Sequence, residues 1–181
     1  MKKSLALVLL LLVSVVALGA QAQGWREFTS PEGFFSVEVP DAPVRETKTQ
    51  TDPNAGEFTT NLYISRAPGE VYVFGWVDYD PKFKFGVQAE LEANRDKFVA
   101  AMKAKLLETT KISLGTHPGI EFTAELPNAR IKSRVYVVGR RPYQLIAVTS
   151  PGGNSAPNVE RFLKSFTLSP ATERPRRATL P

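Results

Sequence analysis

Short runs of alternating apolar residues, separated by turn signals, fill residues 25–80. Ser30-Pro31-Glu32-Gly33 and Pro68-Gly69 are turn sequences, because proline fixes an early φ in a β-turn and glycine accepts the geometry needed later. Between these breaks every second residue falls on one face, which is typical of a strand. The pattern predicts strands, the third of them at a sheet edge, over Trp25–Thr29, Phe34–Val39, Val44–Thr51, Phe58–Arg66 and Val71–Tyr79.

The period changes over residues 86–108. Apolar side chains recur there at the spacing of one helix face, while charged residues, Glu90 among them, take the other positions of the helical wheel. This segment is predicted to be an amphipathic helix of about six turns that packs on a sheet. Its apolar positions are Val87, Leu91, Phe98, Met102 and Leu106.

Strand patterns resume after residue 110 and end in a second helical pattern. A loop over residues 151–154 leads to Ser155, a suitable helix N-cap. Val159, Phe162, Leu163 and Phe166 then follow helical spacing. The predicted strands are Lys111–Leu114, Gly119–Leu126, Arg130–Val138 and Tyr143–Thr149.

Two central strands, Val71–Tyr79 and residues 143–148, are apolar at both odd and even positions. A strand of this kind must be covered on both faces, and the two predicted helices supply the cover. The sequence therefore predicts an α+β fold: an α/β/α sandwich with a central, mainly antiparallel sheet. The long helix lies on one face and the short C-terminal helix on the other.

The N-terminus carries an export signal. Lys2 and Lys3 precede an apolar run that ends before the small-residue site Ala20-Gln21-Ala22, so residues 1–22 are expected to be a signal peptide cleaved after Ala22. The run is short for a membrane span, and no transmembrane anchor is expected after cleavage. Residues 23–169 then form one exported domain, periplasmic or secreted. The basic, proline-rich tail 170–181 is expected to be disordered.

Composition excludes several classes of site. The chain has no Cys and one His, which excludes disulfides, thiolate metal sites, a Cys nucleophile and multi-His metal sites. The net charge of +5 arises mainly at the two ends, from Lys2 and Lys3 and from the tail arginines. The domain between is close to neutral, so no nucleic-acid partner is expected. The tail offers weak electrostatic contact with an anionic surface; its candidate residues are Arg174, Arg176 and Arg177.

A basic stripe on one predicted strand could cradle an anion, but its partner strand argues against that. Arg130, Lys132 and Arg134 share one face of the strand. Pairing through the Pro127-Asn128 turn sets Glu125 opposite Arg130, Thr123 opposite Lys132 and Glu121 opposite Arg134. The same register sets Ile120 by Val135, Phe122 by Ser133 and Ala124 by Ile131 on the apolar face. Opposite charges across strands are a structural feature, which leaves Arg140 and Arg141 as candidate anion or surface contacts.

Three further features could carry chemistry. Asp78 and Asp80 stand two apart at a strand end and are the only candidates for a divalent-cation site or a carboxylate pair, although no third ligand is near them in sequence. His117 lies in a predicted exposed turn without a visible nucleophile. The 151–155 loop lacks the spacing of a phosphate-binding loop. No catalytic residue, cofactor site or metal site is therefore assigned, and the aromatic residues of the central strands are interpreted as core.

Four segments are similar to a known family. They read WREFTSPEGFFSV at 25–37, KISL at 111–114, RVYVVGRRPYQL at 134–145 and RFLKSF at 161–166. Over roughly residues 25–168 the chain resembles exported bacterial proteins related to the PsbP-like proteins, which are extrinsic subunits of photosystem II in phototrophs. The resemblance implies the α/β/α sandwich and a non-enzymatic accessory or binding role. These motifs are turns and core residues, so no catalytic residue is transferred by them.

The resulting hypothesis is an exported, non-enzymatic accessory domain that docks on or stabilises an envelope component, with an envelope protein as partner. The alternatives are a binding module for a small ligand or a divalent cation, and a hydrolase that uses a carboxylate pair. A deep pocket with convergent carboxylates would favour the alternatives. A flat exposed apolar patch above about 600 Å² would favour the accessory domain.

Overall fold

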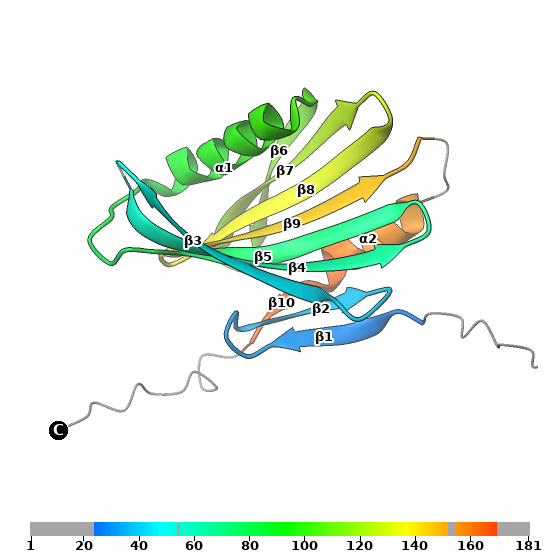
Figure 1. The fold of residues 1–181 in the computed structure, drawn as a ribbon, viewed down its shortest axis with the longest axis horizontal. Coiled ribbons are helices and arrows are strands. Elements are labelled where there is room, and N and C mark those ends of the chain that lie inside the picture. Colours follow the sequence, from blue (N-terminus) through cyan, green and yellow to red (C-terminus); the bar gives the residue numbers. More distant parts are fainter. Residues whose placement is uncertain (1–23, 54, 152–154, 170–181) are drawn as a thin grey trace, which may run out of the picture.

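A computed structural model describes residues 24–53, 55–151 and 155–169 of the chain. The predicted signal peptide and the tail, with Arg174, Arg176 and Arg177, lie outside the described residues. Figure 1 shows the elements of the described part. In chain order they are β1 (Arg26–Ser30), β2 (Phe35–Val39), β3 (Val44–Asp52), β4 (Gly56–Ala67), β5 (Glu70–Tyr79), α1 (Val87–Met102), β6 (Lys105–Leu114), β7 (His117–Leu126), β8 (Ala129–Val138), β9 (Arg141–Thr149), α2 (Ala156–Ser165) and β10 (Thr167–Leu168).

The described strands form two antiparallel sheets. The larger has seven strands in the order β3-β4-β5-β9-β8-β7-β6, with β3 at one edge as predicted. The smaller joins β1, β2 and β10. The sequence pattern located β1 and β2 but did not separate them from the central sheet. The two sheets are separated in the chain by the segment between β2 and β3, which contains Pro40 and Pro43. A proline has no N–H with which to continue the hydrogen-bond ladder of a sheet.

The two helices cover opposite faces of the seven-stranded sheet, as the sequence predicted. On β5, Tyr72, Phe74 and Trp76 point into the cluster that contains α2, while Val73 packs in the cluster that contains Phe98 of α1. Helix α1 lies over β7 and β8, and α2 contacts β8, β9 and β2 (Figure 1). The small sheet packs on the α2 side and completes that layer.

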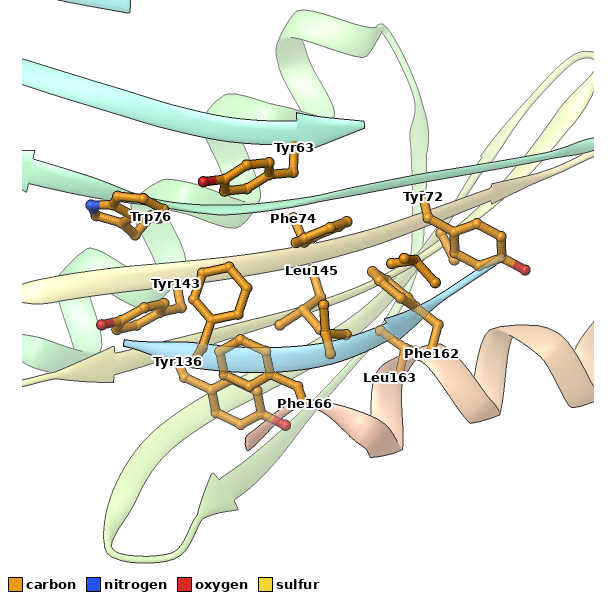
Figure 2. Packing of buried hydrophobic residues seen from close by; sticks show 14 of the residues in the cluster. Tyr63, Tyr72, Phe74, Trp76, Tyr136, Tyr143, Leu145, Phe162, Leu163 and Phe166 are labelled. Carbon is orange, nitrogen blue, oxygen red and sulfur yellow. The ribbon is translucent and has the colours of Figure 1, made fainter. Parts of the chain in front are cut away.

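The main core is an aromatic cluster between the two sheets (Figure 2). Phe35 of β2 is fully buried at its centre, with ring centroids 5.3 Å from Phe166, 6.1 Å from Phe74 and 6.1 Å from Trp76. A fully buried side chain of this size stabilises a fold by about 1.5–3 kcal/mol. This cluster therefore holds β2 and α2 onto the central sheet.

The long helix is shorter than predicted. Helix α1 ends at Met102, followed by Lys103 in the left-handed region at φ 52°, and the chain enters β6 at Lys105 instead of continuing as a helix to residue 108. The apolar spacing of Leu106 imitated another helical turn. Pairing of β6 with β7 over residues 105–114 supplies ladder hydrogen bonds that a longer helix would lose.

The start of α2 was located correctly, but the expected cap bond is absent. Ser155 occupies the N-cap, yet its side chain makes no capping hydrogen bond. Pro157 stands in the first turn, where a missing N–H costs nothing. Neither helix in the described ranges has the length and apolar character needed to cross a membrane.

Candidate functional site

Four of the candidate residues from the sequence meet at one end of the seven-stranded sheet. Asp78, His117, Arg140 and Arg141 line a shallow cleft of about 600 Å³, which we call the sheet-end cleft. Asp78 comes from β5, His117 opens β7, Arg140 lies in the turn between β8 and β9, and Arg141 begins β9. Strands β5 and β9 pair antiparallel, so the end of β5 lies beside the start of β9, which explains how residues 78 and 141 become neighbours.

Arg141 is held by protein groups on several sides. Its Nε and Nη2 donate to Oδ1 of Asp78 at 2.8 and 2.7 Å, and its Nη1 donates to the carbonyl of Glu32 at 3.0 Å. The guanidinium also lies 5.4 Å from the ring centroids of Phe34 and Trp76. Arg141 therefore ties β9 to β5 and to the turn before β2. An anion would compete with these contacts for the guanidinium.

Arg140 organises the connection from β5 to α1. Its guanidinium donates to the carbonyls of Asp80 and Phe83 at 2.9 and 2.8 Å. The Asp80 side chain accepts from the backbone N–H of Lys82 at 2.7 Å, which is the turn role expected of an aspartate before Pro81. The pair Arg140 and Arg141 thus fixes the loops around the cleft.

The geometry gives a divalent cation at Asp78 little support. Both oxygens of Asp78 are engaged, Oδ1 by Arg141 and Oδ2 by Nε1 of Trp76 at 2.7 Å. A cation shared with Asp80 would have to displace the guanidinium of Arg141. Within residues 24–53, 55–151 and 155–169, no group of three or more His, Asp or Glu side chains is placed to hold a metal ion.

His117 differs from the sequence prediction. It was expected in an exposed turn, but it is the first residue of β7, pairs with Leu114 and is half-buried on the wall of the sheet-end cleft. The turn itself is Gly115-Thr116, where Gly115 has φ 58°. Because the hairpin is tighter than predicted, His117 is drawn into the strand.

The predicted β7–β8 register is confirmed, and it neutralises the basic stripe. Glu121 pairs with Arg134, and Glu125 pairs with Arg130. Glu121 accepts from Arg134 at 2.7 Å and from Lys132 at 3.2 Å, while Glu125 lies 3.7 Å from Arg130. Burial, the largest single influence, lowers the pKa of Arg134, but its hydrogen bond to Glu121 and the attraction of Glu121 and Tyr136 together outweigh burial and raise that pKa. The stripe is a structural charge network.

Lys132 also bonds to Glu160 of α2 at 2.5 Å. This hydrogen bond, the largest influence, lowers the pKa of Glu160, so the bond stabilises the fold above the ordinary glutamate pKa and is lost as the pH falls through the folded value. Glu160→Gln is expected to flatten the fall in unfolding free energy between about pH 5 and 3. Urea unfolding at several pH values measures this; an unchanged slope would contradict it.

The structure contains a second hollow that the sequence did not indicate. We call it the α1 cavity: about 460 Å³ between α1 and strands β4, β5 and β9. Glu90 lines it and is 6% exposed, although its place on the helical wheel predicted a solvent-facing residue. Its Oε1 accepts from the hydroxyl of Tyr79 at 2.7 Å and from Nδ2 of Asn94 at 2.8 Å. Burial and the bond to Glu90 raise the pKa of Tyr79, so its hydroxyl stays a donor.

The only sequence signal for this buried carboxylate was its spacing from Asn94. A Glu and an Asn four residues apart lie on the same side of a helix and can bond to each other. That spacing is common on solvent-exposed helices, so it does not by itself separate a buried pair from an exposed one.

Apolar residues are exposed beside the end of α1. Met102 is 41% exposed, Leu106 38% and Leu107 45%, although Met102 and Leu106 were predicted to face the sheet from a longer helix. The ladder shifts register between Leu106 and Glu108, so a bulge lies at this point of β6. We call Met102, Leu106 and Leu107 the 102–107 patch.

The aromatic residues of the central strands are core, as interpreted from the sequence. Tyr63, Tyr72 and Trp76 are at most 8% exposed and belong to the aromatic cluster (Figure 2). Trp25 packs against this cluster. Tyr79 is the exception, because it lines both the α1 cavity and the sheet-end cleft.

Comparison with known proteins identifies the fold. No protein-family model matches the sequence, and no curated protein matches it. Among solved structures, the chain is similar to cyanobacterial PsbP (CyanoP) from Synechocystis sp. PCC 6803, with 8% identity over 83% of this chain and 95% of that chain and a TM-score of 0.55. A crystal structure from Bacteroides thetaiotaomicron VPI-5482 aligns at 15% identity with 83% of this chain and 50% of that chain, with a TM-score of 0.39. The antiparallel sheet, its helix on each face and the CyanoP likeness together show that this chain has the PsbP-like fold.

Proposed function

We propose that this chain is an exported, non-enzymatic accessory domain that docks on another envelope component through the 102–107 patch. One observation carries the proposal. Of the five large hydrophobic side chains that are exposed in the described residues, three fall within residues 102–107. Single exposed apolar residues are ordinary on a protein surface, but a local group of them marks a contact surface.

The patch is built for side-chain docking. Met102 ends α1, and Leu106 and Leu107 begin β6, so the patch rests on a helix end and on a strand of the central sheet. Burying such a side chain against a partner contributes about 1.5–3 kcal/mol before the entropic cost of association is counted. Lys105 and Glu108 stand beside the leucines and supply the charged surroundings typical of an interface rim.

Strand β6 is less suited to pair with a strand of the partner than to offer its apolar side chains for contact. Strand β6 is the last strand of the seven-stranded sheet, but it carries Lys105, Glu108 and Lys111 and the bulge after Leu106. Charges and bulges on edge strands oppose pairing with another chain. The partner is therefore expected to contact the apolar side chains and leave the strand edge unpaired.

The PsbP-like fold supports an accessory role, because the resemblance seen in the sequence is to a family whose better-known members act as extrinsic, non-enzymatic subunits. The predicted export signal is the reason to expect the partner in the envelope. The basic tail is proposed to assist by weak attraction to an anionic surface, and it does not define the partner.

The patch can be tested with a variant set that this chain supplies. Met102→Gln, Leu106→Gln and Leu107→Gln together remove the patch; Val44→Gln and Val87→Gln remove the other two exposed large hydrophobics and serve as the control. The immobilised mature chain is expected to retain a stoichiometric envelope partner from its own organism at moderate salt. The control keeps that partner and the patch variant loses it. Retention of anionic material alone, released by salt, would contradict the proposal and point to the tail.

A further inference from the structure

The α1 cavity has the dimensions of a small-molecule site. Its volume of about 460 Å³ lies within the range of ligand pockets, roughly 300–1,000 Å³. Phe58 of β4, Val77 of β5 and Phe98 of α1 form part of a largely apolar wall. Helix α1 lies over β7 and β8, which leaves room between it and the β4–β5 side of the sheet. The hollow thus combines an apolar wall with the carboxylate of Glu90.

The hydrogen bonds of Glu90 are one-sided. Tyr79 and Asn94 both donate to Oε1, and in the described part of the chain no donor contacts Oε2. Every fully enclosed side-chain oxygen described here has a hydrogen-bond partner, so Oε2 is not fully enclosed. The hollow that Glu90 lines is the α1 cavity. Oε2 is therefore an accessible acceptor without a protein donor, on a side chain that lines the cavity.

Glu70, the other buried glutamate, shows the contrast. It is 7% exposed, and both of its oxygens are used: Oε2 accepts from Tyr72 at 2.5 Å, and Oε1 accepts from Asn158 at 3.1 Å. Those bonds join β5 to α2 and have a purely structural explanation. Glu90 has the same kind of partners, a Tyr and an Asn, but leaves one oxygen without a protein donor.

Charge and aromatic rings favour a cation at this position. The ionisable side chains on the cavity wall include two carboxylates, Asp52 and Glu90, and one amine, that of the exposed Lys97. Tyr79 and Phe83 also line the cavity, with ring centroids 5.0 Å apart. Aromatic faces beside a carboxylate attract an ammonium group and leave an anion without a donor.

We infer that the α1 cavity binds a small organic ammonium ion with an apolar body. The ammonium donates to Oε2 of Glu90, and the body packs between Phe58, Val77 and Phe98. This site uses no residue of the 102–107 patch, so a test of ligand binding in the cavity is independent of a test of the docking function.

Titration calorimetry with 2-phenylethylammonium tests the site, and 3-phenylpropionate serves as the anionic probe of similar size. The full chain is expected to bind the ammonium probe with a Kd near or below about 1 mM and to bind the anion at least about tenfold more weakly. Glu90→Gln keeps an acceptor for Tyr79 and Asn94 but removes the charge, and it is expected to weaken the ammonium probe about tenfold or more. Glu92→Gln, an exposed change on the same helix, is the matched control and leaves binding unchanged.

Ala93→Phe provides a second test that leaves the Glu90 hydrogen bonds in place. Ala93 lines the cavity, so the larger side chain fills it and is expected to abolish binding of the probe. Thermal unfolding of each variant establishes that it is folded before binding is measured. Absence of binding by the unaltered chain, equal binding of the two probes, or unchanged binding in either Glu90→Gln or Ala93→Phe would overturn the inference.

Discussion

Phe35→Ala is expected to lower the free energy of unfolding by about 3–5 kcal/mol. Phe35 is fully buried where β2, α2 and the central sheet meet. Its ring has aromatic neighbours from five other elements or connections, so truncation leaves a cavity that no single side chain can refill. The neighbours are Phe28, Tyr63, Phe74, Trp76, Tyr143 and Phe166, at centroid separations from 5.3 to 6.5 Å.

Denaturant unfolding followed by tryptophan fluorescence measures this loss, because Trp76 belongs to the same cluster. Val44→Ala is the control, since Val44 is 59% exposed at the edge strand and should change the unfolding free energy by less than about 0.5 kcal/mol. A loss at Phe35 no larger than at Val44 would show that the small sheet is not packed on the central one.

Gly75→Ala is expected to destabilise the protein by about 3 kcal/mol. A Cβ added at Gly75 would lie 1.9 Å from the carbonyl oxygen of Asn61, far inside van der Waals contact. The obstacle is backbone of β4, which is bonded to β5 on one side and β3 on the other, so it cannot yield without loss of ladder hydrogen bonds. The close approach explains a glycine in an otherwise apolar central strand.

Gly86→Ala provides the matched comparison. A Cβ there meets nothing closer than the Cβ of Ala89 at 4.0 Å, and the backbone φ of −80° suits any residue. Because Gly86 is the N-cap of α1, where alanine is less favourable than glycine, its unfolding free energy should fall by no more than about 1 kcal/mol in the same urea titration. Equal stability of the Gly75 and Gly86 variants would contradict the close packing of β4 on β5.

Local patterns in the sequence were sufficient for most of the central sheet. The β7–β8 register follows from the Pro127-Asn128 turn alone, because a one-residue slip would have placed Glu121 and Glu125 on the face that α1 covers. The apolar character of both faces of β5 likewise required a helix on each side, which the structure confirms. The first feature joins strands that are neighbours in the chain, and the second can be recognised from the residues of one strand.

Features that depend on distant partners were not predictable in this way. The end of α1 at Met102 is set by the pairing of β6 with β7, and the wheel position of Glu90 does not show that Tyr79 lies opposite it. The sheet-end cleft joins Asp78 to Arg141 across 63 residues of sequence, so the sequence could name both residues but not their ion pair. The second sheet was not predictable for the same reason, because β10 pairs with β2 only after the chain has passed through α2.

The docking proposal is tested most directly by a crosslink from the patch itself. Leu107 replaced by photoreactive benzoylphenylalanine, in the full chain expressed in its own organism, is expected to give one discrete crosslinked species on irradiation. The same replacement at Lys48, an exposed residue of the opposite edge strand β3, is expected to give none. Absence of a product from position 107, or the same products from both positions, would contradict docking through the 102–107 patch.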